Sequence, residues 1–253
     1  MREILQNMTW RWTAGWGRTA REVWHFCATG KAGAGDNPAC RLLPPGTQKG
    51  AKSADLFLIA GDLFDSNRIP ASGAEFVHSE LARVPCPVVL IPGNHDCYDH
   101  RSIYKKVDFT AAGPHVHTLI EEEGTTIQFP HLQATVWGKG MVEHDHHYRP
   151  LAGVPPRYGD YWHIGMAHGY FVDEEELQRS SLITPEEIAQ SGLDYLALGH
   201  VHVFTELSQG TTKACYPGTP APLHLGVHDG GSVALVTLDP DAGVTLVQRK
   251  IVL

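Results

Sequence analysis

The chain has 253 residues, of which 42% are hydrophobic and 19% charged, a composition typical of globular rather than disordered proteins. A net charge of −8 argues against a nucleic-acid binder that works by phosphate neutralisation alone, although metal ions could still attract phosphate to such a chain. The longest apolar runs have the length of strands, so we expect neither a membrane span nor a secretory signal. Five scattered cysteines exclude a disulfide framework and favour a cytoplasmic location.

The character of the sequence changes near residue 51. Residues 1–50 hold seven basic and three acidic side chains, a net charge of +4, and the stretch 30–50 shows no period of 2 or 3.6 residues. We therefore predict an atypical N-terminal segment over 1–50, either non-native or poorly ordered. A single folded domain over 51–253, without a C-terminal cap domain, is expected to follow it.

The first elements expected in the folded part form a β–α–β unit. Residues 55–60 and 87–91 are short apolar runs that end at glycine or proline, and 71–84 carry apolar side chains at helical spacing. A strand, a helix and a strand within about 35 residues predict a parallel pair of strands with a right-handed crossover.

The remaining sequence predicts more strands and one further helix. Three closely spaced strands at 116–121, 125–129 and 133–137 indicate an antiparallel meander. The helix is expected at 184–191, with Thr184 as its N-cap, Pro185 at its first position and Gly192 at its end. Further strands are expected at 162–167, 195–198, 213–216, 232–238 and 244–252. This mixture predicts an α/β fold of two mixed sheets with helices outside.

Four short blocks, each directly after an apolar strand, carry side chains with chemistry: Gly61-Asp62-Leu63-Phe64-Asp65, Gly93-Asn94-His95-Asp96, Ala167-His168-Gly169 and Gly199-His200-Val201-His202. Ligand sites of open α/β sheets form at the carboxyl ends of strands, and glycine lets the backbone turn there. Alone, a Gly-Asp is usually a turn and a His-x-His is usually a pair of strand residues. Together the blocks supply a carboxylate, an amide oxygen and several imidazoles, which suits Mn, Fe, Zn or Co.

With these blocks, residues 53–252 resemble the calcineurin-like metallophosphoesterase superfamily, and within it most closely the SbcD-type DNA-repair exonucleases. Residues 195–200 (YLALGH) and 216–220 (YPGTP) support the resemblance, the latter being similar to the YPGSP block of that group. The resemblance implies a four-layer α/β/β/α sandwich with a two-metal site where the two sheets meet.

The resemblance also implies metal ligands. Asp62 would bridge two divalent ions, with manganese expected and iron, zinc or magnesium as alternatives. Asn94, His168 and His200 would complete the set of the second ion, and His202 would bind the first.

Two further residues would act in catalysis by the same resemblance. A metal-activated hydroxide would attack phosphorus, and His95 would protonate the leaving alkoxide as the general acid. Asp96 would orient His95 and fix its tautomer. Asp65 is expected in the turn rather than among the ligands.

One block of the family is missing from the sequence. The family opens with Asp-x-His after its first strand, but residues 1–55 contain only two aspartates, Asp36 and Asp55, and neither has a histidine two positions further on. We therefore predict one well-formed metal site and one crippled site.

Three explanations for the missing block stay open. Residues 1–50 could come from a shifted reading frame or a wrongly chosen start, or the chain could be a degenerate enzyme. Alternatively, Asp145-His146-His147, within the histidine-rich stretch His144–His147, could replace the missing ligands. A solvated loop that faces the substrate is the favoured interpretation of that stretch.

The resemblance implies a metal-dependent phosphoesterase that hydrolyses phosphodiesters in the manner of a DNA exonuclease and works with an ATPase partner subunit. The alternatives are a small-molecule phosphodiesterase or phosphomonoesterase, and a phosphate-binding pseudoenzyme that lacks the first metal site.

Overall fold

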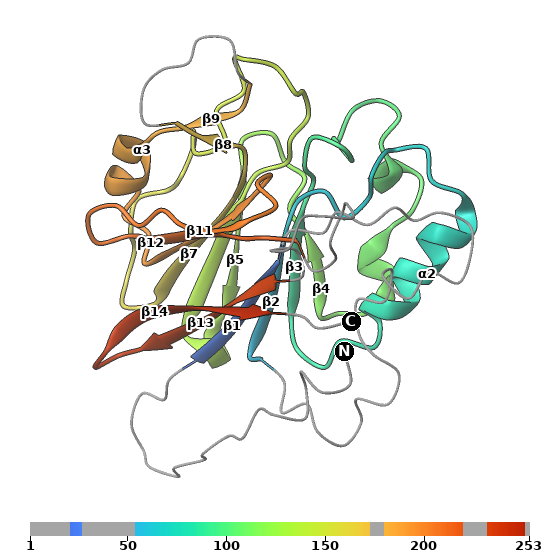
Figure 1. Cartoon of the computed structure of the whole chain (residues 1–253). Helices are drawn as coiled ribbons and strands as arrows, with labels where there is room; N and C mark the ends of the chain where they lie inside the picture. The colour runs from blue at the N-terminus through green and yellow to red at the C-terminus, as the bar shows by residue number, and fades with distance from the viewer. Residues whose placement is uncertain (1–20, 27–53, 173–179, 220–231, 251–253) are drawn as a thin grey trace.

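Two six-stranded sheets form the centre of the fold (Figure 1). The computed structural model describes residues 21–26, 54–172, 180–219 and 232–250. The first sheet has the order β14 (Gly243–Lys250), β13 (Ser232–Asp239), β1 (Arg21–Phe26), β2 (Leu56–Ala60), β3 (Val88–Ile91) and β4 (Val116–Thr118). The second has the order β11 (Phe204–Glu206), β12 (Lys213–Pro217), β10 (Tyr195–Gly199), β7 (Trp162–His168), β6 (Ala134–Gly138) and β5 (Thr125–Phe129).

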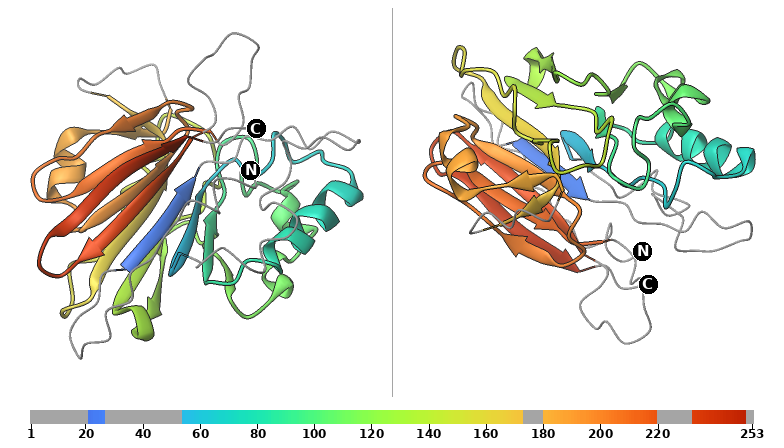
Figure 2. Two further views of the ribbon diagram at one scale, coloured as in Figure 1. Left: turned by 60° about the horizontal axis from the view of Figure 1, so that its bottom comes forward. Right: turned by 90° about the horizontal axis from the view of Figure 1, so that it is seen from above.

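Alternating side chains divide the core into three apolar layers. In β2, Leu56, Leu58 and Ala60 pack between the two sheets, whereas Phe57 and Ile59 pack on the opposite face of the first sheet, toward α2 (Ala71–Leu81). Strand β10 divides its residues in the same way, and its outer face packs against α3 (Pro185–Gln190). The two helices therefore lie on opposite sides of the paired sheets (Figures 1 and 2). The result is the four-layer α/β/β/α sandwich that the resemblance implies.

The predicted β–α–β unit is confirmed. Strands β2 and β3 are parallel, with Phe57 opposite Val88, and α2 connects them, ending three residues earlier than expected. The second helix also begins as predicted, because Thr184 forms a capping box with Glu187 and Pro185 occupies the first turn. No helix among the described residues is long and apolar enough to span a membrane.

The predicted meander is wrong in one respect. Strands β5 and β6 are antiparallel as expected, but β4 pairs in parallel with β3 in the other sheet. The chain therefore passes from the first sheet to the second between β4 and β5. Spacing along the chain could not reveal this, because pairing depends on partners remote in sequence.

Strand β1 was not predicted. It lies at the centre of the first sheet, parallel to β2 and antiparallel to β13, within the segment interpreted as atypical. Residues 1–20 and 27–50 of that segment lie outside the described residues, as do the last residues of the strand expected at 244–252.

Three short elements and a small sheet complete the fold. The 3₁₀ turns η3 (Ile103–Lys105), η4 (Phe109–Ala112) and η5 (Pro130–Leu132) lie in the connections, and β8 (Tyr170–Phe171) pairs in parallel with β9 (Leu182–Ile183). Strand β8 comes directly after the end of β7 and therefore lies next to the site described below.

Candidate active site

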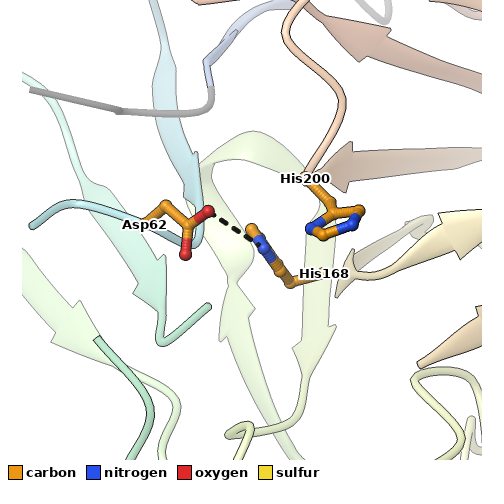
Figure 3. Close-up of side chains that lie close together, drawn as sticks. All are labelled: Asp62, His168 and His200. Atoms are coloured by element: carbon orange, nitrogen blue, oxygen red, sulfur yellow. Dashed lines mark ion pairs between the residues drawn. The ribbon is translucent and has the colours of Figure 1, made fainter. Parts of the chain in front are cut away.

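Polar side chains from four strand ends meet where the two sheets approach each other. Asp62 follows β2 and Asn94 follows β3 in the first sheet, whereas His168 ends β7 and His200 follows β10 in the second. Asp62, His168 and His200 each offer a ligand atom, and these three atoms lie within 4.8 Å of one another (Figure 3). The structure therefore brings together the four side chains expected around the second metal ion.

Close approach and unusual backbone angles at the strand ends make this convergence possible. A Cβ on Gly199 would collide with the carbonyl oxygen of Ala60, so only glycine lets the ends of β10 and β2 touch. Asp62 and His200 adopt positive φ angles of 54° and 106°, which cost non-glycine residues about 1–3 kcal/mol and are typical of functional sites.

The ring of His168 has a fixed orientation. Its Nδ1 donates a hydrogen bond to the carbonyl oxygen of Ala60 at 2.8 Å, because a carbonyl can only accept. Its Nε2 lies 2.9 Å from Oδ1 of Asn94 and 3.2 Å from Oδ2 of Asp62. If Nε2 were unprotonated, its lone pair would face those of the two oxygens. The space between these three atoms therefore requires a positive charge.

The contacts of Asp62 also indicate that a positive charge belongs at this site. Its Oδ1 accepts a hydrogen bond of 2.9 Å from the backbone N–H of His95, which connects the turns after β2 and β3. Its Oδ2 is buried and, within the described part of the chain, has no partner with hydrogen-bond geometry besides its ion pair with His168. A divalent cation would satisfy Oδ2, the Asn94 amide oxygen and the His168 Nε2 at once. The donor set of oxygen and imidazole ligands therefore fits a metal of the Mn, Fe or Zn kind.

The charges of the site favour the metal-binding forms of Asp62 and His200. Burial acts to raise the pKa of Asp62, but His168 and the N–H of His95 outweigh it and hold that pKa at about 2. Burial and the nearby His168 lower the pKa of His200 to about 4, so its imidazole is neutral at pH 7. Burial acts to lower the pKa of His168, whereas Asp62 raises it more strongly. In the metal-free protein, Asp62 therefore favours a proton on His168 at the point where a metal ion would lie.

The structure corrects the contact expected between Asp96 and His95. Asp96 is fully buried, and its carboxylate accepts hydrogen bonds from the backbone N–H groups of Gly93 and Phe64 and from the Tyr104 hydroxyl. Burial, reinforced by the nearby Asp62 charge, raises the pKa of Asp96 to about 6. The two neighbours in the turn diverge, because His95 faces the solvent while Asp96 faces the core.

His95 has Asp65 as its partner instead. The Nδ1 of His95 donates to the backbone carbonyl of Asp65 at 3.1 Å and lies 3.9 Å from the Asp65 carboxylate. The contact that sequence reasoning assigned to Asp96 thus comes from the turn after β2. The spacing within Gly61–Asp65 could not reveal it, because it depends on how two separate turns meet.

His202 lies outside the group of three ligand atoms. It is partly buried after β10, and no described residue completes a second group of three or more such ligands around it. Residues 27–53, which follow β1, lie outside the described part of the chain, so the crippled first site stays a prediction.

The structure assigns Asp145 to a turn. Its carboxylate accepts hydrogen bonds from the backbone N–H groups of His147 and Tyr148, at 2.7 and 2.9 Å. This fits the solvated loop favoured from the sequence. One side chain of the stretch nevertheless reaches the site, because the ring of His144 lies 6.5 Å from the ring of His200.

Tyr216 is a supporting residue that sequence reasoning did not single out for this role. Its buried hydroxyl donates to the carbonyl of Gly169 at 2.7 Å and accepts from the N–H of Phe171 at 2.8 Å. These contacts fix the backbone immediately after His168.

We expect Tyr216→Phe to lower the free energy of unfolding by about 2 kcal/mol, because both backbone partners of the hydroxyl lose a hydrogen bond. We also expect metal affinity to fall about tenfold, since the substitution loosens a residue next to a ligand. Urea unfolding and manganese titration would measure the two effects. Tyr158→Phe, at an exposed tyrosine, serves as the control. Unchanged metal affinity in Tyr216→Phe would contradict the supporting role.

Comparison with known proteins agrees with this geometry. The family model for calcineurin-like phosphoesterases matches residues 39–204. A protein of Bacillus subtilis (strain 168), named uncharacterized metallophosphoesterase YhaO, is 27% identical over 180 residues. That match covers 68% of this chain and 42% of the relative, so the chain spans less than half the length of the relative.

Solved structures share the fold. One has a TM-score of 0.60 at 15% identity, over 92% of this chain and all of the other. A second, TT1561 of Thermus thermophilus, has a TM-score of 0.57 at 17% identity, over 92% of this chain and 99% of the other. At these identities the likeness shows the fold alone.

The family match and the ligand cluster fall on the same residues. The match contains Asp62, Asn94, His168 and His200, the four side chains that meet at the strand ends. The chain belongs to the calcineurin-like phosphoesterase family.

Proposed function

We propose that the protein hydrolyses phosphodiesters, in the manner of a DNA exonuclease, with one divalent ion, preferably manganese, held by Asp62, Asn94, His168 and His200. The observation that carries the proposal is the buried point between Asp62 Oδ2, Asn94 Oδ1 and His168 Nε2, which requires a positive charge. Iron, zinc and magnesium are the alternative ions. The preference for diesters rests on the resemblance to SbcD-type exonucleases.

A bound divalent ion supplies positive charge to phosphate oxygens and lowers the pKa of water. The chain supplies the acid that completes the reaction. The Nδ1–H of His95 is occupied by the Asp65 carbonyl, which leaves Nε2 to carry a proton toward the leaving alkoxide. The Asp65 carboxylate lies 3.9 Å from the same Nδ1 and, with the Asp65 carbonyl, helps to hold the ring in this orientation. In this proposal Asp96 acts indirectly, by holding the turn that carries His95.

Manganese stoichiometry and ester preference test the proposal together. After manganese loading and desalting, we expect one metal ion per chain by elemental analysis. Two ions would mean that His202 and residues outside the described part build a first site. We expect faster turnover of bis(p-nitrophenyl) phosphate than of p-nitrophenyl phosphate. The reverse order would favour a phosphomonoesterase.

A matched variant tests the acid. We expect His95→Ala to keep its manganese but to lose turnover by roughly 10²-fold, since general acid catalysis contributes on that scale. Asp99→Ala, a partly exposed position in the same loop, is the control. Equal turnover in His95→Ala and the unmutated protein would contradict the role of His95.

The missing Asp-x-His block favours a second candidate, a pseudoenzyme that binds phosphate compounds without efficient turnover. Its signature would be inorganic phosphate binding by the manganese-loaded protein together with turnover of neither ester. The proposal also includes DNA as the substrate, an ATPase partner subunit and a cytoplasmic location. The substrate and the partner derive from the resemblance, and the location derives from the cysteine pattern.

A further inference from the structure

The side chain of His144 borders the candidate site without belonging to its ligands. Its ring centre lies 6.5 Å from that of His200, yet it is absent from the described group of ligand atoms within 4.8 Å of one another. It is exposed, whereas Asp62 and His168 are buried. His144 therefore lies on the solvent side of the ligands, where a substrate would enter.

The loop that carries His144 is held in place from two sides. Within the loop, the Asp145 carboxylate accepts the N–H groups of His147 and Tyr148. Across the loop, the N–H of Ser181 donates to the carbonyl of Asp145 at 3.3 Å. The loop is thereby fixed to the segment that enters β9, so the position of His144 is preorganised.

A hydroxyl group also fixes the ring itself. The Nε2 of His144 lies 2.5 Å from Oγ of Ser180, which is 36 residues away in the sequence. When the Ser180 hydroxyl donates to Nε2, the ring carries its proton on Nδ1. That nitrogen has no hydrogen-bond partner within the described residues, so it can donate to a ligand.

We propose that His144, held by Ser180, is a substrate-binding residue that donates a hydrogen bond to a non-bridging oxygen of the phosphate group. The inference rests on the proposed function, because it requires phosphate beside His200. It extends that function by adding a contact from the connection between β6 and β7, outside the four strand-end blocks.

Inorganic phosphate and manganese are the probes for this proposal. In calorimetric titration of the manganese-loaded protein, we expect His144→Ala to raise the Kd for phosphate about tenfold, the scale of one hydrogen bond to a charged group. Ser180→Ala should raise it about threefold, because the ring loses its orientation but keeps its donor. His147→Ala, in the same loop, should match the unmutated protein. Manganese content should be equal in all four proteins.

Kinetics separate a binding role from a merely structural one. With bis(p-nitrophenyl) phosphate, we expect His144→Ala to raise KM about tenfold and to leave kcat within about twofold. His144→Asn retains a donor and should recover part of the loss. An unchanged Kd for phosphate, or loss of manganese from His144→Ala, would overturn the proposal.

The two proposals can fail separately. If the unmutated protein binds phosphate but hydrolyses neither ester, the proposed diesterase function fails, while the phosphate titration still decides the role of His144. If it hydrolyses esters and His144→Ala behaves like His147→Ala, only the inference about His144 fails. If the manganese-loaded protein binds no phosphate, the inference is overturned.

Discussion

Asp62→Asn is expected to remove the bound metal ion and nearly all phosphoester hydrolysis. Asparagine can still accept the N–H of His95, but it lacks the negative charge that a cation needs beside His168. Loss of an outer partner of a metal ligand typically costs 10- to 100-fold in affinity or activity, so loss of a direct ligand should reduce turnover by more than about 10²-fold. Elemental analysis and bis(p-nitrophenyl) phosphate turnover would measure the two losses.

A second aspartate provides the matched control. Asp99 lies in the loop after β3, just beyond His95, and its carboxylate accepts only the N–H of Arg101 within the described residues. Asp99→Asn should therefore keep both metal and turnover. A cooperative urea transition in Asp62→Asn would show that the variant still folds. Full manganese content in that variant would contradict the site built around Asp62.

Local signals predicted the parts of the fold that local forces determine. Strand β2 and helix α3 lie within a residue or two of their expected bounds, because an apolar run ended by Gly61 and a capping box at Thr184 are short-range features. Strand β4 was assigned to the wrong neighbour because its partner, β3, is separated from it by a long connection. Strand β1 was missed because its pairing with β2 and β13 is entirely non-local.

The candidate site also has features that the sequence could predict and features that it could not. Sequence reasoning placed Asp62, Asn94, His168 and His200 at strand ends, and topology brings such ends to one edge, so their convergence was predictable. The direction in which a side chain leaves a turn is a finer property. It depends on contacts such as that between His95 and Asp65, which come from two turns about 30 residues apart. No periodicity or spacing encodes such a contact.

Asp96→Ala is expected to lower the free energy of unfolding by about 4 kcal/mol. The buried carboxylate accepts hydrogen bonds from the N–H of Gly93 at 2.7 Å, the N–H of Phe64 at 3.2 Å and the hydroxyl of Tyr104 at 2.9 Å. Alanine would leave these three donors buried without an acceptor, and each such donor costs about 1–3 kcal/mol. Urea unfolding of the metal-free protein would measure the change.

Two further variants decide what Asp96 does. Tyr104→Phe removes one of the three hydrogen bonds and should cost about 1 kcal/mol, whereas Asp65→Ala, at an exposed side chain, should change stability by less than about 0.5 kcal/mol. For catalysis the order of these two variants should be reversed, with the larger effect from Asp65→Ala. Asp65→Ala should lower kcat, because the Asp65 carboxylate lies 3.9 Å from Nδ1 of His95 and helps to orient its ring. A fall in kcat for Asp96→Ala with an unchanged free energy of unfolding would contradict the structure, because only a direct contact with His95 would produce it.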